Sequence, residues 1–311
     1  MNATASPYTR PLPTTIPEYL EQLRQALHGA DKAMVQDALY DAEEYLRAEL
    51  AANQAAGSGR SEAEVIAAVA GSYGAPEEVA DIYRETEVTV NRALRPPRPP
   101  QRRSLAGRFF GVVADPYTYG SLFYMLLALA TGTFYFSWVV TGLSLSAGLL
   151  ILVIGIPLLM LFLMSVRLLS LVEGRIVEVL LGVRMPRRPL YTQRDKPWLT
   201  RIGELFTDAR TWTTMGYMLL MLPLGVLYFS VVVTLLAVSV SLIAAPVALL
   251  LGGAGVISLD GVNITPESPL LWPLCMAVGV VLLFATLHLA RLVGHFHGWL
   301  AKHVLVRDPV V

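Results

Sequence analysis

The sequence contains a single cysteine and no cleavable secretory signal. Cys275 is the one cysteine among 311 residues, so no disulfide can form within the chain. The cysteine count therefore does not indicate whether the protein works in an oxidising or a reducing compartment. We interpret Cys275 as a small residue inside a membrane helix. The first 17 residues contain four prolines and no apolar run, which argues against a secretory signal and predicts a disordered segment over residues 1–13.

Signatures of common catalytic and cofactor sites are also missing from the sequence. It has no phosphate-binding P-loop, no Rossmann glycine pattern, no nucleophile elbow and no HExxH zinc motif. Four histidines gather between His288 and His303, but no cysteine or carboxylate lies near them in sequence to complete a metal site. We interpret this segment as an interfacial helix, and we expect no enzymatic activity, no cofactor and no metal.

Lysine and arginine are absent from two long apolar stretches, Phe109–Val166 and Thr211–Ala290. About 20 apolar residues in a helix cross a bilayer core about 30 Å thick, so each stretch is long enough for two crossings. We therefore predict an all-α polytopic membrane protein. Its four transmembrane helices are expected at residues 118–141, 145–168, 211–236 and 271–292.

The positive charges fall in three blocks, at residues 10–108, 167–210 and 291–307. Loops rich in Lys and Arg stay in the cytoplasm, so all three blocks lie on one side and an even number of crossings separates them. We expect a bacterial inner-membrane protein with both termini in the cytoplasm. Segment 242–251 is too short to span, so we expect a re-entrant or interfacial helix before an outer loop at residues 252–270.

Charged residues are absent from the predicted spans, except for Arg167 and Arg291 at their ends. This argues against a proton- or ion-coupled transporter, which carries ionisable groups within the membrane. Segments 168–183 and 197–207 have the pattern of interfacial helices. We expect the basic strip around them to bind anionic lipid headgroups rather than nucleic acid. This strip consists of Arg184, Arg187, Arg188, Arg194, Lys196, Trp198 and Arg201.

Residues 115–141 align without a gap with residues 208–234, at an offset of 93 positions. Apolar composition alone would not also match polar and small residues in register. The matched pairs include Asp115 with Asp208, Tyr124 with Tyr217, Gly132 with Gly225 and Tyr135 with Tyr228. We interpret the two parts, 108–190 and 191–311, as a parallel internal repeat about an axis along the membrane normal. The outer loop of the second copy is either a place to receive a stimulus or only a tolerated insertion.

Residues 14–94 predict a soluble domain of four helices. Tyr19, Leu20, Leu23 and Leu27 form an apolar stripe, and Ser61 with Glu64 forms a capping box. The domain has 15 acidic and 6 basic residues, a net charge of −9, which excludes phosphate-driven nucleic-acid binding. It is expected to dock on the basic membrane-proximal face of its own chain or on a basic partner, unless its acidic surface is simply solvated. A proline- and arginine-rich linker follows at residues 95–107.

Within this domain, the segments DAEEY (Asp41–Tyr45), SEAE (Ser61–Glu64) and YGAPEEVA (Tyr73–Ala80) resemble the HAAS-type helical signalling domain. That family occurs on bacterial membrane proteins and is often linked to PadR-type transcriptional regulators. The resemblance implies a partner-binding surface, which we place at Tyr45, Tyr73, Gly74, Pro76, Glu77 and Glu78.

Residues 108–190 and 208–305 resemble a sensor domain that precedes histidine kinases in some bacteria. The resemblance rests on the repeat and on an arginine-rich helix after each pair of spans. Because this sequence has no kinase module, we expect its output to pass to a separate protein.

Together these features predict a membrane sensor or regulator that relays an envelope or lipid signal to a cytoplasmic partner such as a PadR-type regulator. An accessory or structural subunit of a membrane transport complex is one alternative, and a lipid-handling membrane protein is another. Membrane lipids and a cytoplasmic protein are the expected partners, and homo-oligomerisation stays open.

Overall fold

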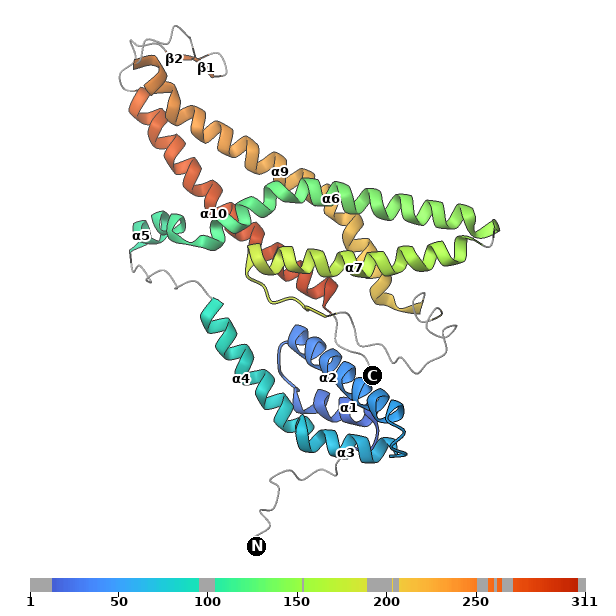
Figure 1. Ribbon diagram of the computed structural model, residues 1–311. Helices are drawn as coiled ribbons and strands as arrows, with labels where there is room; N and C mark the ends of the chain where they lie inside the picture. The colour runs from blue at the N-terminus through green and yellow to red at the C-terminus, as the bar shows by residue number, and fades with distance from the viewer. Residues whose placement is uncertain are drawn as a thin grey trace.

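The computed structural model describes residues 13–94, 104–152, 154–188, 203, 207–250, 257–259, 262–264 and 271–306. Within these residues, a helical domain lies at one end of a bundle of longer helices (Figure 1). Several predictions fall outside the described residues. They concern residues 1–12, most of the linker and of the outer loop, and Arg194, Lys196, Trp198 and Arg201 of the basic strip.

Four helices form the N-terminal domain: α1 (Ile16–Ala26), α2 (Lys32–Ala55), α3 (Glu62–Ser72) and α4 (Pro76–Leu94). Asp31 caps α2, because its carboxylate accepts a hydrogen bond of 2.9 Å from the backbone N–H of Ala33. Ser61 and Glu64 form the predicted capping box at the start of α3. These side chains satisfy backbone N–H groups that have no partner within the helix, so each helix begins where its cap stands.

The core of this domain joins its first helix to its last. Tyr19, Leu23 and Leu27 of the predicted stripe are completely buried. The Tyr19 hydroxyl donates a hydrogen bond of 2.7 Å to the carbonyl oxygen of Gly74. Gly74 has φ of +115°, a conformation that other residues rarely adopt, so the turn before α4 requires glycine.

The membrane part contains four long helices, α6 (Pro116–Leu149), α7 (Gly155–Leu181), α9 (Ala209–Leu250) and α10 (Leu271–Leu305). Shorter elements are α5 (Leu105–Phe110), the 3-10 turns η1 (Gly111–Ala114) and η2 (Leu150–Leu152), and the antiparallel strands β1 (Ile257–Leu259) and β2 (Val262–Ile264). The four long helices are apolar and long enough to cross a membrane. The prediction of a helical membrane protein with four spans is therefore confirmed.

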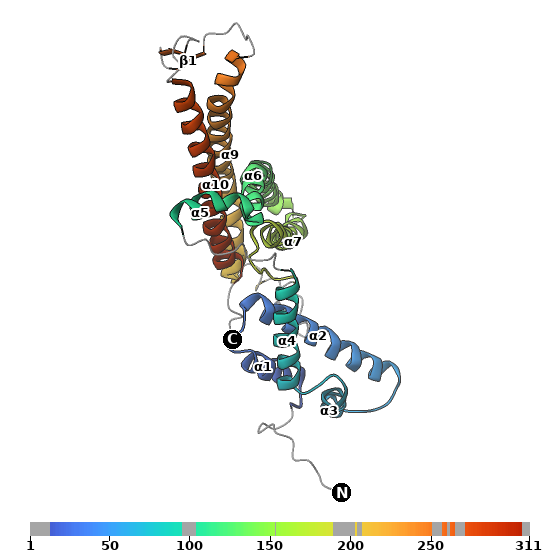
Figure 2. The same cartoon turned by 90° about the vertical axis from the view of Figure 1, so that its left-hand side faces the viewer.

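The long helices form two hairpins, α6 with α7 and α9 with α10, and α6 crosses α9 (Figures 1 and 2). Two glycines lie at the crossing. A Cβ atom added to Gly132 would lie 2.4 Å from the carbonyl oxygen of Met221, and one added to Gly225 would lie 2.2 Å from that of Ala128. Only glycine at both positions lets the two backbones approach this closely.

The ends of the membrane helices differ from the prediction. Helix α6 continues through the expected turn and ends at Leu149, and α9 continues to Leu250 with Pro223 and Pro246 inside it. The separate re-entrant or interfacial helix predicted at residues 242–251 is therefore wrong. Proline is tolerated within membrane helices because neighbouring groups satisfy the freed backbone carbonyl.

The segment 168–183 is not a separate interfacial helix, because α7 runs without interruption to Leu181. Helix α7 consequently carries Arg167, Glu173, Arg175 and Glu178. The predicted span 145–168 itself contains no acidic residue, and Glu173 and Glu178 lie on the part of α7 that continues beyond it. The apolar run ends in the middle of this helix, and tertiary partners support the remainder.

Candidate functional site

A carboxyl group and an imidazole lie buried together where α7 and α10 approach α6 and α9. Glu173 on α7 is 1% exposed and His297 on α10 is completely buried. The histidine segment, predicted as an interfacial helix, is part of the continuous helix α10, and His297 is buried against the other helices. A charged or polar group is costly to bury unless it is hydrogen-bonded, so the partners of this pair decide what it can do.

Two tyrosines bridge the pair. The Tyr124 hydroxyl donates to Oε1 of Glu173 at 2.7 Å and lies 2.6 Å from Nε2 of His297. The Tyr217 hydroxyl repeats both contacts, at 3.2 Å and 2.9 Å. Tyr124 lies on α6 and Tyr217 on α9, so residues from all four long helices meet at this point.

Two further tyrosines complete the cluster. The Tyr135 hydroxyl donates to Oε2 of Glu173 at 3.0 Å, and the Tyr228 hydroxyl lies 3.4 Å from Nδ1 of His297. Both carboxyl oxygens and both ring nitrogens thus have a phenol partner. We call Glu173, His297 and these four tyrosines the buried polar cluster.

The proton count of the buried polar cluster limits its states. An ionised Glu173 beside a neutral His297 leaves one uncompensated negative charge in a buried site, which is unfavourable. One further proton makes the cluster neutral. Because Tyr124 and Tyr217 each contact both groups, their hydroxyls can donate to the carboxylate and accept from the ring, or the reverse, without moving the side chains. The arrangement can therefore hold one exchangeable proton.

A metal ion is a second use for a carboxylate beside an imidazole. Among the described residues, however, no group of three or more His, Cys, Asp or Glu side chains lies together in a position to hold one. The residues that complete the cluster are instead phenols, which serve as hydrogen-bond donors and acceptors.

The sequence contains a signal for this cluster that hydropathy does not show. Glu173-Gly174 follows Arg167 by six residues, and His297-Gly298 follows Arg291 by the same interval. A Cβ atom added to Gly298 would lie 2.6 Å from the Val183 side chain, so the glycine makes room for the segment after α7.

Two ion pairs join the hairpins to each other. Arg291 on α10 pairs with Asp115, the N-cap of α6, at 3.2 Å. Arg167 on α7 pairs with Asp208, just before α9, at 3.1 Å. Each hairpin therefore supplies an arginine to the aspartate that precedes the first helix of the other.

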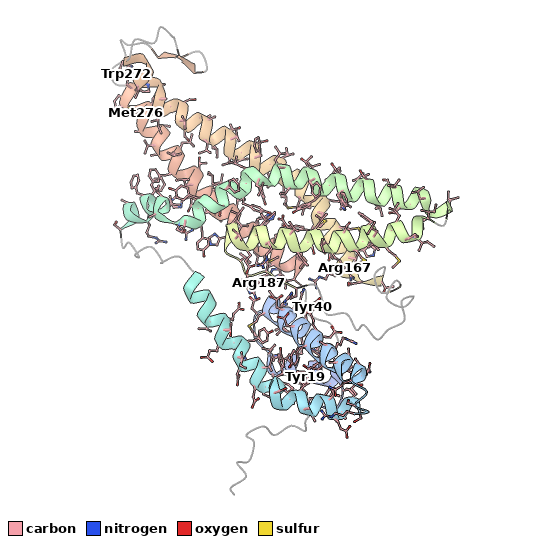
Figure 3. The ribbon with its side chains drawn as sticks, viewed as in Figure 1. Tyr19, Tyr40, Arg167, Arg187, Trp272 and Met276 are labelled. Atoms are coloured by element: carbon pink, nitrogen blue, oxygen red, sulfur yellow. The ribbon has the colours of Figure 1, made fainter. Side chains whose placement is uncertain are left out.

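The helical domain docks on the segment that follows α7, and Asp37 of α2 lies at the centre of this contact. One Asp37 oxygen accepts hydrogen bonds of 2.7 Å from the backbone N–H groups of Arg187 and Arg188. The other pairs with the Arg184 guanidinium at 3.0 Å. Burial raises the pKa of Asp37, although these three donors act in the opposite direction. We call this contact the docking interface (Figure 3).

Further contacts surround Asp37. Arg188 pairs with Asp41 at 2.9 Å, and its guanidinium lies 5.7 Å from the centre of the Tyr40 ring. Gln36 donates to the Arg188 carbonyl oxygen at 2.6 Å, and Lys302 of α10 pairs with Asp31. Arg184, Arg187 and Arg188 of the basic strip therefore contact the acidic domain of their own chain, and their contact with lipid headgroups stays a prediction.

Glu178 connects α7 to the docking interface. It pairs with Arg184 and Arg187, each at 3.2 Å. Glu178 follows Glu173 by five residues on α7, and Lys302 follows His297 by the same interval on α10. Each helix that supplies one member of the buried pair is therefore also linked to the helical domain, α10 directly through Lys302 and α7 indirectly through Glu178 and Arg184.

The residues predicted to bind a partner gather around the turn before α4. Tyr45 stacks on Tyr73 with ring centres 4.4 Å apart, and Pro76 is buried. Glu78 accepts a hydrogen bond of 3.1 Å from the backbone N–H of Ala75. Together with Gly74, these four residues support the turn before α4. Glu77 is half-buried beside them.

These features define a polytopic membrane protein in which a helical domain docks on the ends of membrane helices that share a buried polar cluster. Residues 124–305, more than half of the chain, match the family model described as "Putative sensor". The chain belongs to this family. Comparison with curated proteins and with solved structures gave no match.

Proposed function

We propose that the protein is a membrane sensor in which the buried polar cluster controls how tightly the helical domain is docked. The observation that carries this proposal is the shared use of α7 and α10. Glu173 and His297 set the positions of these helices in the bundle. On the same helices, Glu178 pairs with Arg184, which in turn pairs with Asp37 of α2, and Lys302 pairs with Asp31, the N-cap of α2. A change in the cluster therefore reaches the docking interface through two continuous helices.

The predicted internal repeat supports this proposal. Gly132 and Gly225 align in the predicted repeat. Gly132 lies against the backbone of Met221 on α9, and Gly225 lies against the backbone of Ala128 on α6. Two equivalent hairpins that cross at glycine can change their relative angle as rigid bodies. The cluster lies between them, so it would respond to an envelope or lipid state that alters this angle.

The output is proposed to pass to a cytoplasmic protein, in line with the HAAS-like character of the domain. Helix α4 presents Ile82, whose side chain is 57% exposed, among the exposed acids Glu78, Asp81 and Glu85. Such a face suits a partner with a basic rim around an apolar patch, such as a PadR-type transcriptional regulator. The confinement of Lys and Arg to three blocks supports a cytoplasmic location for this domain, and the protein would act by binding rather than by catalysis.

Hydrogen exchange of the full-length protein in lipid nanodiscs tests the coupling. Glu173→Gln and His297→Gln each remove a titratable group from the cluster at a position that does not contact α2. Both are expected to raise amide exchange in the first turns of α2. Thr133→Ala, at an exposed position of α6, is the matched control. Unchanged α2 exchange in both cluster variants, with thermal stability like that of the wild type, would contradict the proposal.

Partner binding has a separate test. Full-length protein is expected to capture a PadR-type regulator from the same operon, and Ile82→Asp is expected to abolish capture. Failure to recover a regulator, together with unchanged transcription when the gene is deleted, would count against this output.

A further inference from the structure

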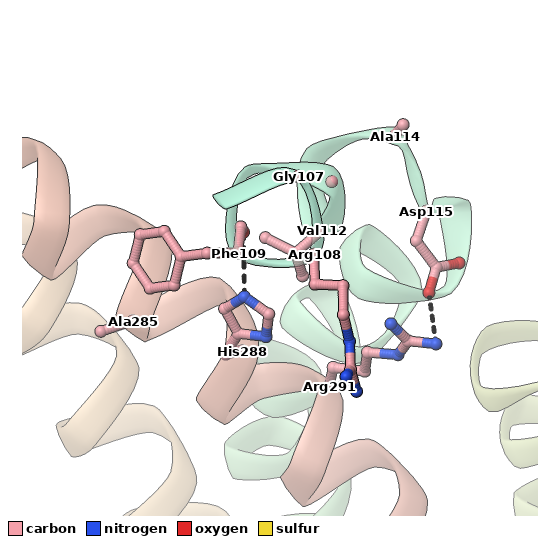
Figure 4. A pocket seen from close by; sticks show the side chains of 10 residues that line it. Gly107, Arg108, Phe109, Val112, Ala114, Asp115, Ala285, His288 and Arg291 are labelled. Carbon is pink, nitrogen blue, oxygen red and sulfur yellow. Dashed lines mark hydrogen bonds and ion pairs between the residues drawn. The ribbon is translucent and has the colours of Figure 1, made fainter. Parts of the chain in front are cut away.

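A cavity of about 710 Å³ lies between the short helix α5 and the middle of α10, away from the buried polar cluster and the docking interface (Figure 4). Its walls are mostly apolar and include Phe109, Val112 and Ala285. Two arginines, Arg108 and Arg291, also line this cavity (Figure 4).

The two arginines are unequally neutralised. Arg291 pairs with Asp115 at 3.2 Å, and Asp115 also accepts a hydrogen bond of 3.1 Å from the backbone N–H of Tyr117. The Arg108 side chain has no hydrogen bond or ion pair to any other described residue. The two arginines and the one aspartate that line this cavity leave a net positive charge, which an anion would neutralise.

His288 adds a directed polar group. Its Nε2 atom lies 3.0 Å from the carbonyl oxygen of Phe109. A carbonyl oxygen only accepts hydrogen bonds, so Nε2 carries the proton and Nδ1 is left for another partner. The Phe109 ring stacks on His288 with centres 5.4 Å apart and also contacts Phe284. These contacts fix α5 against α10, so the cavity is a built feature of the fold.

We propose that this cavity binds the phosphate group of an anionic membrane lipid. Arg108 and Arg291 would hold the phosphate oxygens, for which planar guanidinium groups are well suited. A chain of the lipid would lie along the apolar wall at Phe109 and Ala285.

Two observations favour a lipid over a soluble phosphate. The side chains of Phe110 and Val113, on the same short elements, are 48% and 42% exposed, as expected for a segment against a bilayer. Arg291 lies 20 residues after the start of α10 at Leu271, which is one membrane crossing. The charged side of the cavity is therefore at headgroup depth and its apolar wall faces the acyl chains.

Native mass spectrometry of the full-length protein tests the proposal with phosphatidylglycerol as the probe. Wild-type protein is expected to retain one phosphatidylglycerol in preference to phosphatidylcholine. Arg108→Gln is expected to weaken this binding by about tenfold or more, because it removes a charge-assisted contact, and Arg108→Lys should restore part of it. Arg175→Gln, which changes an exposed arginine on α7, is the matched control.

Two further arms separate the sources of the phosphate. Ala285→Phe fills the apolar wall and is expected to weaken phosphatidylglycerol binding while leaving both arginines in place. Inorganic phosphate is expected not to displace the bound lipid at equal concentration. Equal losses in Arg108→Gln and Arg175→Gln, or displacement by inorganic phosphate alone, would overturn the proposal. The site is independent of the sensor proposal, since binding is measured without reference to docking.

Discussion

Replacing Asp37 by asparagine is expected to loosen the helical domain without unfolding it. The new amide oxygen can still accept from the N–H groups of Arg187 and Arg188, which lie 2.7 Å from the wild-type oxygen. The amide nitrogen, however, then faces the Arg184 guanidinium, and because both groups are donors no hydrogen bond can form between them. The variant therefore loses one buried, charge-assisted hydrogen bond at 3.0 Å.

The magnitude follows from the other partners of Arg184. Breaking a buried ion pair costs about 3–5 kcal/mol when the remaining charge is left alone. Arg184 keeps Glu87 at 3.1 Å and Glu178 at 3.2 Å, so the loss should approach that of one hydrogen bond to a charged group, about 1.5–3 kcal/mol. A loss of about 2 kcal/mol shifts the docking equilibrium roughly 30-fold.

The assay is a salt titration followed by the distance between two spin labels in nanodiscs. Cys275 is first replaced by serine, and labels are placed at the exposed positions Ala67 on α3 and Leu292 on α10. Salt screens the ion pairs, so the domain undocks at a midpoint salt concentration, and Asp37→Asn should lower that midpoint. Asp81→Asn, whose wild-type side chain is 71% exposed, is the matched control. Equal midpoints for all three proteins would refute the reasoning.

Three other predictions concern stability. Gly132→Ala should lower the thermal midpoint in detergent, since its Cβ would meet a backbone oxygen at 2.4 Å, whereas Gly148→Ala, with open space around it, should not. Tyr124→Phe should destabilise by about 1–3 kcal/mol in chemical denaturation, because it removes one hydrogen-bond partner from each of two buried groups, Glu173 and His297. Tyr228→Phe, which loses one contact at 3.4 Å, should cost less, and equal losses would contradict this. The hydrogen bond from the Ser61 backbone lowers the pKa of Glu64, so its stabilisation of α3 is present above the unfolded pKa of about 4.3 and is lost as pH falls through the lower folded value. Amide protection of α3, corrected for intrinsic exchange, should therefore fall in acid, and Glu64→Gln should remove that dependence.

The helical domain was largely predictable because its signals are local. Tyr19, Leu23 and Leu27 repeat at helical spacing and are buried, and Ser61 with Glu64 marks a helix start within four residues. Hydropathy likewise locates four spans, because the transfer of apolar residues into lipid depends on composition.

The buried polar cluster and the true helix ends were not predictable in the same way. Glu173 and His297 are separated by more than a hundred residues, and their partners lie on two other helices. A single carboxylate beside an apolar run looks like the end of a span, because its compensating hydrogen bonds appear only after packing. For the same reason Pro246 suggested a break that the packed bundle does not contain.

The glycine contact between α6 and α9 is a narrow hinge about which the two helical hairpins can rotate. Because neither Gly132 nor Gly225 has a side chain, a change in the angle between the hairpins disturbs little packing at the hinge itself. Membrane helices tilt when bilayer thickness changes, so a thinner or thicker bilayer would change the angle between the two hairpins. The ends of α7 and α10 nearest the helical domain, where Arg184 and Lys302 bind Asp37 and Asp31, would then shift sideways, and bilayer thickness would become a displacement that a soluble protein can detect.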